Sequence, residues 1–214
     1  MSRSTLMLAI LTAAVLWGGH AATSAAPQAP ADNTETAVFS MYCYWTGEAT
    51  IGEVPGVVRT RIGSLGGNEV VEVEYDPART DVGRLAQALK RRNSFYALIA
   101  PDRGAAARAR RLVPASDVEV RSGSVRYTEE PKHSLRVVHP ALYYLDLTEA
   151  QAIALNTWSH FGGPMPDVLT AEQKEMLEEV RQRLAAGETP GTEPARAGRE
   201  REQYRRTLMA WLGR

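Results

Sequence analysis

The chain's only cysteine, Cys43, directly precedes two aromatic residues, Tyr44 and Trp45. A thiolate is a strong nucleophile, and its surroundings decide whether it reacts. We expect Cys43 between a strand and a helix, where unpaired backbone N–H groups favour the thiolate, whereas burial would leave the thiol inert. The two aromatic side chains offer an apolar wall for a substrate. This pattern indicates a nucleophilic thiol at Cys43.

Glu69 is the second residue whose position favours chemistry. In the strand expected at Val70–Tyr75, alternate residues point to opposite faces, and Glu69 shares the parity of Val71 and Val73. A carboxyl group on the apolar side is partly buried, which favours the protonated form that a general acid needs. The alternative is a strand-end glutamate that turns into solvent beside the Gly66–Gly67 turn.

Hydrophobic periodicity predicts the elements that position these residues. Strands are expected at 36–41, 57–62, 70–75 and 95–100, and helices at 46–54 and after Thr80, which would be an N-cap. The order β-α-β-β-α-β is typical of a ferredoxin-like two-layer α/β sandwich, in the α+β class, with its helices on one face. We expect a β-hairpin around Ser122–Gly123 and a helical C-terminal extension.

The remaining segments divide the chain further. Arg3, an apolar run and small residues up to Ala25 have the order of a secretory signal peptide, so we expect export, to the periplasm in a Gram-negative bacterium. Thr148 and Thr170, each with glutamine three residues on, predict helix starts. The expected segments are a signal peptide (1–25), a flexible linker (26–35), the α/β domain (36–102), a basic helix with the hairpin (103–146), a helical region (147–186), a second linker (187–198) and a C-terminal amphipathic helix (199–214).

Charge and composition argue against several classes of function. The 25 basic and 25 acidic side chains balance, so no nucleic-acid partner is indicated. The arginines between Arg103 and Arg111 are interpreted as a solvated helix face. The histidines lack the spacing of a zinc site, and neither a metal nor a cofactor is expected. The apolar stripe of the last helix, around Trp211, favours packing over stable membrane association after processing.

Several short motifs together resemble one known family. They are Cys43–Ala49, Pro55–Val58, Thr60, Gly63, Gly66–Gly67, Glu69–Val71, Val73 and Tyr75–Pro77. In this order they resemble the signature segments of peptide methionine sulfoxide reductase A, and the chain is identified as a divergent, shortened and exported member. The resemblance implies an α/β two-layer sandwich.

The resemblance also implies roles for particular residues. Cys43 would be the nucleophile, Glu69 the acid, and Tyr44 with Trp45 the wall for the substrate methyl group. The substrate would be methionine sulfoxide, free or in peptides, reduced at a single cysteine through a sulfenic acid. Without a second cysteine, an external thiol or an exported thioredoxin-like protein would supply the reducing equivalents.

The chain departs from the family pattern at three places. The family's long loop between the Gly-Gly turn and the glutamate, which carries a tyrosine, is missing. Its Gly-His before the glutamate is also missing, with Asn68 where the neighbour of the histidine would be, and its Asp-His-Gly-Thr-Gln-Tyr segment has no counterpart. Tyr42, Tyr75 and Tyr96 are candidate replacement hydroxyl donors. These departures keep open a catalytically degenerate module with a binding or structural role.

Two weaker resemblances remain. Val54–Val57 is similar to the Val-Pro-Gly-Sec motif of exported thioredoxin-like selenoproteins, with Val57 in place of the selenocysteine. The β-α-β-β-α-β order is also similar to soft-metal-binding modules. Those use a Cys-x-x-Cys pair, so one cysteine would need a dimer or outside ligands.

Overall fold

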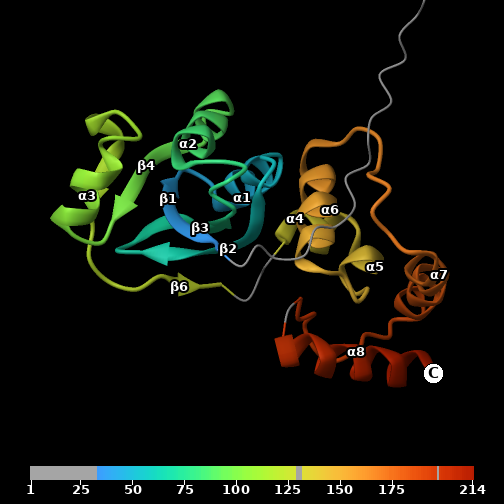
Figure 1. The fold of residues 1–214 in the computed structure, drawn as a ribbon. Coiled ribbons are helices and arrows are strands. Elements are labelled where there is room, and N and C mark those ends of the chain that lie inside the picture. Colours follow the sequence, from blue (N-terminus) through green and yellow to red (C-terminus); the bar gives the residue numbers. More distant parts are fainter. Residues whose placement is uncertain (1–32, 129–131, 197) are drawn as a thin grey trace, which may run out of the picture.

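The computed structural model describes residues 33–128, 132–196 and 198–214. An α+β unit and a helical unit lie side by side (Figure 1). The predicted signal peptide (1–25) and residues 26–32 of the predicted linker lie outside the described residues. In the part of the chain that the structure describes, no helix is long and apolar enough to cross a membrane.

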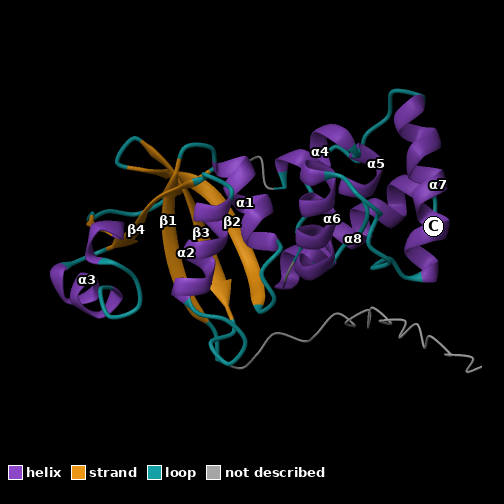
Figure 2. Cartoon of the chain, turned by 90° about the horizontal axis from the view of Figure 1, so that it is seen from above, coloured by secondary structure: helices purple, strands orange, loops and turns teal. Residues whose placement is uncertain are grey.

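The α+β unit is built on a six-stranded sheet with the order β5-β4-β1-β3-β2-β6. Its strands are β1 (Glu35–Met41), β2 (Val57–Leu65), β3 (Asn68–Tyr75), β4 (Phe95–Ala100), β5 (Val118–Val120) and β6 (Arg126–Tyr127). The first four strands pair antiparallel, with β1 and β3 in the centre. Helices α1 (Tyr44–Gly52) and α2 (Val82–Arg91) lie over the sheet (Figure 2). The predicted two-layer α+β sandwich is confirmed.

The alternation of β3 explains how the sheet is filled on both faces. Val71 and Val73 are completely buried in the main core, together with Phe39 and Leu85. Val70, which has the opposite parity, joins a smaller cluster with Leu65, Ala97 and Ile99 on the other face. Both faces of the central strands are therefore apolar, and the helices cover one of them.

The predicted β-hairpin around Ser122–Gly123 is wrong. Strand β5 pairs parallel to β4 at one edge of the sheet, and β6 pairs antiparallel to β2 at the other. Helix α3 (Arg103–Ala109) and the 3-10 turn Ala115–Asp117 connect β4 to β5, as a parallel pair requires.

The chain then crosses to the opposite edge. Arg121 Nη1 donates a hydrogen bond to the Leu65 carbonyl oxygen at 3.0 Å, and Val125 packs on the smaller cluster. Two short apolar segments around a Ser-Gly dipeptide have the composition of a hairpin. The chain crosses the sheet instead, because Val125 packs on the smaller apolar cluster on the face that the helices leave open. Gly63 allows β6 to approach, because a Cβ there would lie 2.4 Å from the Arg126 carbonyl oxygen.

Helix starts differ slightly from expectation in the α+β unit. Helix α1 begins at Tyr44, so Cys43 is its N-cap residue. Asp81 caps α2 by accepting a hydrogen bond from the Arg84 N–H at 2.9 Å. The prediction that Thr80 is the cap is wrong, because its side chain is buried. The arginines of the α3 region are exposed, which confirms a solvated helix face.

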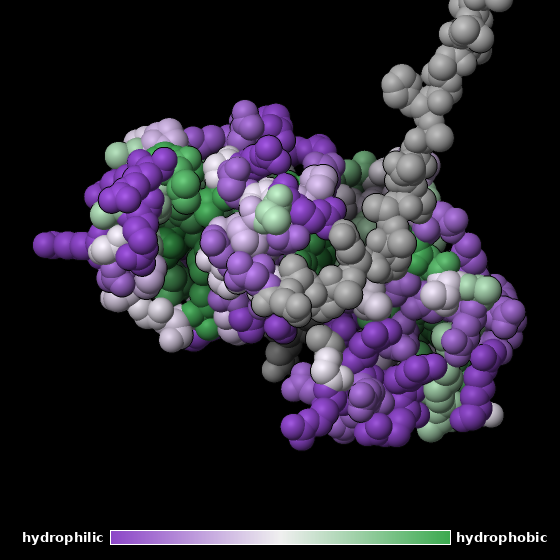
Figure 3. Space-filling view, viewed as in Figure 1, coloured by the Kyte–Doolittle hydropathy of each residue, from purple (hydrophilic) through white to green (hydrophobic). Residues whose placement is uncertain are grey.

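The helical unit has its own buried core. Its helices are α4 (His133–Val138), α5 (Pro140–Tyr143), α6 (Glu149–Phe161), α7 (Ala171–Ala185) and α8 (Gly198–Leu212). Tyr204 and Leu208 of α8 are buried in this core, and Trp211 packs against it. On the face seen in Figure 3, the surface over α8 is mostly hydrophilic.

Both predicted capping boxes are present, and they contact each other. Thr148 caps α6 together with Gln151, and Thr170 caps α7 together with Gln173. The two glutamine side chains are buried and exchange hydrogen bonds of 2.8 and 3.1 Å. The second N–H of each amide donates to a backbone carbonyl oxygen at 2.7 Å, Gln151 to Val168 and Gln173 to Asp146. Both buried amide N–H groups of each glutamine therefore have hydrogen-bond partners.

Part of the predicted second linker is packed against the helical core. Arg196 donates hydrogen bonds to the carbonyl oxygens of Tyr143 and Leu145 at 2.6 and 2.8 Å. Glu193 accepts a hydrogen bond from the Tyr143 hydroxyl at 2.6 Å. These contacts fix residues 193–196 beside α5.

Candidate functional site

Cys43 lies at the junction of β1 and α1, as the sequence predicted. It is the N-cap residue of α1 with extended backbone angles (φ −144°, ψ 113°), and its carbonyl oxygen accepts the first helical hydrogen bond, from the Gly47 N–H at 3.0 Å. The thiol is unpaired and the residue is partly exposed. A side chain at this position is beside the positive end of the helix. Partial exposure leaves the thiol accessible to reagents, unlike the thiol of a fully buried cysteine.

Glu69 lies on the same face of β3 as Val71 and Val73, which confirms the parity argument. Its Oε2 atom accepts a hydrogen bond of 2.7 Å from the Tyr44 N–H, in the first turn of α1. The carboxyl group is partly buried and turns toward the helix instead of into solvent. Antiparallel pairing of β3 with β1 produces this proximity, because Val70 is opposite Ser40 near the end of β1. Cys43 and Glu69 therefore both lie at the first turn of α1.

Tyr44 and Trp45 both lie in this first turn, and their rings meet at a steep angle (73°) with centroids 5.7 Å apart. Both rings pack against the core of the α+β unit. One face of Trp45 is covered by the imidazole ring of His133, stacked at 3.7 Å with an interplanar angle of 4°. A ring from the helical unit therefore stacks on the aromatic wall that the sequence predicted.

A buried ionic network behind this turn was not predicted from the sequence. Lys132 Nζ lies 3.0 Å from Glu48 Oε1 and 2.8 Å from Glu149 Oε1. It also donates to both oxygen atoms of Thr60, each at 3.0 Å. Asn156 Nδ2 donates to the other Glu48 oxygen at 3.3 Å. The network joins α1, β2 and α6.

The charges of the network shift the titration of its members. Burial alone would lower the pKa of Lys132, but Glu149 and Glu48 raise it above its usual value. Burial alone would raise the pKa of Glu149, but the Lys132 charge lowers it. Both shifts favour the charged forms of Lys132 and Glu149. A glutamate between buried residues of α1 was the one sequence signal that could have indicated a buried partner for Glu48.

The candidate hydroxyl donors lie in different places. The Tyr75 hydroxyl donates to Glu35 Oε2 at 2.7 Å, and burial together with Glu35 raises its pKa. Tyr42, next to Cys43, is exposed and meets exposed Tyr96 edge to face at 5.7 Å. Of these candidates, Tyr42 and its neighbour Tyr96 are therefore the hydroxyl groups beside the Cys43 turn.

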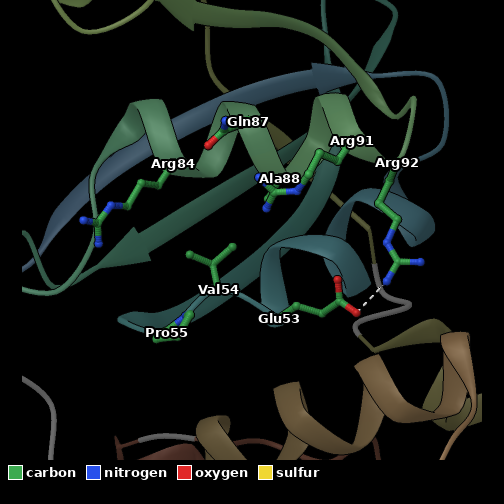
Figure 4. Close-up of a pocket in the computed structure, with 8 residues that line it drawn as sticks. All are labelled: Glu53, Val54, Pro55, Arg84, Gln87, Ala88, Arg91 and Arg92. Carbon is green, nitrogen blue, oxygen red and sulfur yellow. Dashed lines mark hydrogen bonds and ion pairs between the residues drawn. The ribbon is translucent and has the colours of Figure 1, made fainter.

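A separate cavity lies at the opposite end of α1. It has a volume of about 620 Å³, and its lining includes Glu53, Pro55, Arg84 and Arg91 (Figure 4). Cys43 and Glu69 do not line it. Among the described residues, no group of three or more His, Cys, Asp or Glu side chains could hold a metal ion.

The fold and the site define an α+β sandwich with a cysteine at a strand-to-helix junction and a glutamate bound to the same turn. No family model matches the chain. Comparison with curated proteins finds peptide methionine sulfoxide reductase A5 of Oryza sativa subsp. japonica, 39% identical over 93 residues, covering 37% of this chain and 32% of the relative. It also finds peptide methionine sulfoxide reductase MsrA of Methanococcus maripaludis, 41% identical over 61 residues, covering 21% of this chain and 39% of the relative.

A third relative is peptide methionine sulfoxide reductase MsrA 2 of Caulobacter vibrioides, 38% identical over 77 residues, covering 28% of this chain and 39% of the relative. The chain thus spans 32 to 39% of the length of these three relatives. The chain is related to the peptide methionine sulfoxide reductase A family over this stretch, which confirms the resemblance seen in its motifs.

Proposed function

We propose that this protein reduces methionine sulfoxide, free or in peptides, with Cys43 as the nucleophile and Glu69 as the proton donor. The hydrogen bond of 2.7 Å between Glu69 Oε2 and the Tyr44 N–H is the observation that carries the proposal, because it holds a carboxyl group at the turn that bears the thiol. The relationship to the reductase family supports the choice of substrate.

The proposed reaction consumes one thiol for each sulfoxide. The Cys43 thiolate attacks the electrophilic sulfur of the sulfoxide, and Glu69 delivers a proton to the sulfoxide oxygen. The oxygen atom ends on Cys43 as a sulfenic acid, and the thioether of methionine is released. The sulfoxide is reduced by two electrons and Cys43 is oxidised by two.

Regeneration of Cys43 requires thiols from outside the chain, since the chain has one cysteine. The first external thiol forms a mixed disulfide with Cys43 and releases water, and a second thiol restores the Cys43 thiol and leaves as a disulfide. An exported thioredoxin-like protein suits this step, because the first residues of the chain have the order of a secretory signal peptide.

The direct test is steady-state turnover of the purified protein with a dithiol and each epimer of methionine sulfoxide. The resemblance to the reductase A family implies selectivity for the S epimer, so we expect the S epimer to be converted to methionine and the R epimer to remain. Consumption of neither epimer by folded protein would contradict the proposal.

A second candidate function is a binding module without catalysis. It is favoured by the His133 ring that covers Trp45 and by the absence from the sequence of the family's Asp-His-Gly-Thr-Gln-Tyr segment. Such a module would bind methionine sulfoxide peptides without forming methionine, so the same assay separates the two functions.

A further inference from the structure

The aromatic wall beside Cys43 is in contact with a residue from outside the reductase-like motifs. The His133 ring lies 3.7 Å from the Trp45 ring, and the two planes differ by only 4°. His133 is the first residue of α4, in the helical unit, whereas the motifs that resemble the reductase family all lie before residue 90. The helical unit therefore contributes a side chain directly to the candidate site.

The backbone on both sides of His133 is held firmly. Lys132 is buried with its ammonium group in the ionic network, and its backbone has a left-handed conformation (φ 55°). Ser134 and Leu135 are buried on the other side, and the Leu135 N–H donates to Asn156 Oδ1 at 3.0 Å. The contacts of its neighbours therefore fix the position of the His133 backbone.

We propose that His133 competes with the substrate at the sulfoxide site, because its ring covers one face of Trp45, the wall proposed for the substrate methyl group. This inference rests on the proposed function. The imidazole ring and the substrate compete for one aromatic surface, so binding requires His133 to rotate away. His133 takes no part in bond making, and its effect falls on substrate affinity.

The strength of the stack sets the size of the effect. An aromatic pair contributes enough free energy to change a binding constant by about two- to tenfold. Removal of the ring in His133→Ala should therefore lower KM by about two- to tenfold and leave kcat within about twofold. His133→Phe retains a ring of similar shape and should keep KM at the wild-type value or above it.

The chain offers a matched control. His139 stacks on Trp158 at 4.4 Å with an interplanar angle of 18°, within the helical unit. His139→Ala removes the same kind of contact and should change neither KM nor kcat. Equal effects of the two alanine variants would overturn the assignment, because they would indicate a general loss of packing.

Equilibrium binding separates this inference from the proposed catalysis. In full-length Cys43→Ser protein, which cannot turn over, nuclear magnetic resonance should show the His133 ring protons shifted upfield by the Trp45 ring current. Saturating methionine sulfoxide should abolish that shift, and His133→Ala in the same background should bind about two- to tenfold more tightly.

The two possible failures differ in this experiment. Binding with the His133 resonances unchanged would overturn the competition while leaving the proposed function intact. No binding, either with His133 or with alanine in its place, would overturn both proposals. Binding that displaces the ring, combined with no turnover by the wild-type protein, would support the role of His133 in a module that only binds.

Discussion

Lys132 Nζ and Glu48 Oε1 lie 3.0 Å apart, and their side chains are only 2% and 1% exposed. Glu48 belongs to α1, which begins at Cys43, and Lys132 directly precedes α4 of the helical unit. Buried charges of this kind are costly unless each is paired and hydrogen-bonded. The pair therefore couples the position of the helical unit to the helix that presents the thiol.

Removal of the buried ammonium group should destabilise the fold strongly. Lys132→Met leaves the buried Glu48 and the partly buried Glu149 without their cation, so we expect a loss of about 3–5 kcal/mol in the free energy of unfolding. Urea denaturation measures it. Lys174→Met, which breaks an exposed pair with Asp167, is the control and should have little effect. A similar midpoint for both variants would contradict the role of the network.

The network also predicts a dependence of stability on acid. Pairing with Lys132 lowers the pKa of Glu149 below its usual value of 4.5 in the folded protein. As the pH falls below 4.5, the unfolded chain binds a proton that the folded chain does not, so the stabilisation is lost as the pH approaches the folded pKa.

The comparison is between wild type and Glu149→Gln, by unfolding at pH 3 to 7. Wild type should lose more stability than the variant below about pH 4.5. Glu178→Gln, whose carboxylate is 64% exposed, should follow the wild-type curve. Parallel curves for wild type and Glu149→Gln would show that the Glu149 charge does not contribute.

The periodicity of the first hundred residues predicted most of the α+β unit, because strands and helices with an apolar face must bury it, and few layered arrangements do so. The site was predictable in part: the parity of Glu69 indicated its face, and the motif indicated Cys43. Lys132 and His133 could not be predicted, because the contacts of Lys132 with Glu48 and of His133 with Trp45 join residues more than 80 positions apart and leave no local pattern. The β5 and β6 pairing was missed because the two short segments around Ser122–Gly123 have the composition of a hairpin.

Glu69→Gln tests the proposed proton donor. The amide retains the shape and can still accept the Tyr44 N–H bond, but it cannot donate a proton, so turnover should fall about a hundredfold. Alkylation of Cys43 should remain largely intact. Glu74→Gln, on the opposite face of the same strand, is the matched control and should keep wild-type turnover. Unchanged turnover in Glu69→Gln would show that Glu69 only accepts the Tyr44 hydrogen bond and donates no proton.

Cys43→Ser tests whether the thiol is chemical or structural. The exchange is nearly isosteric, and the thiol makes no capping hydrogen bond, so the circular-dichroism spectrum should be unchanged. Sulfoxide reduction should be abolished. A loss of the folded spectrum would instead indicate that Cys43 is needed for packing.

The most direct measurement of the proposed mechanism is a single turnover without reductant. Wild-type protein is mixed with excess methionine sulfoxide and dimedone, and mass spectrometry follows the protein and the methionine formed. The single-cysteine mechanism predicts a dimedone adduct on Cys43 and one methionine per chain, after which reaction stops until thiol is added. Methionine formed repeatedly without thiol, or formed with no modification of Cys43, would contradict it.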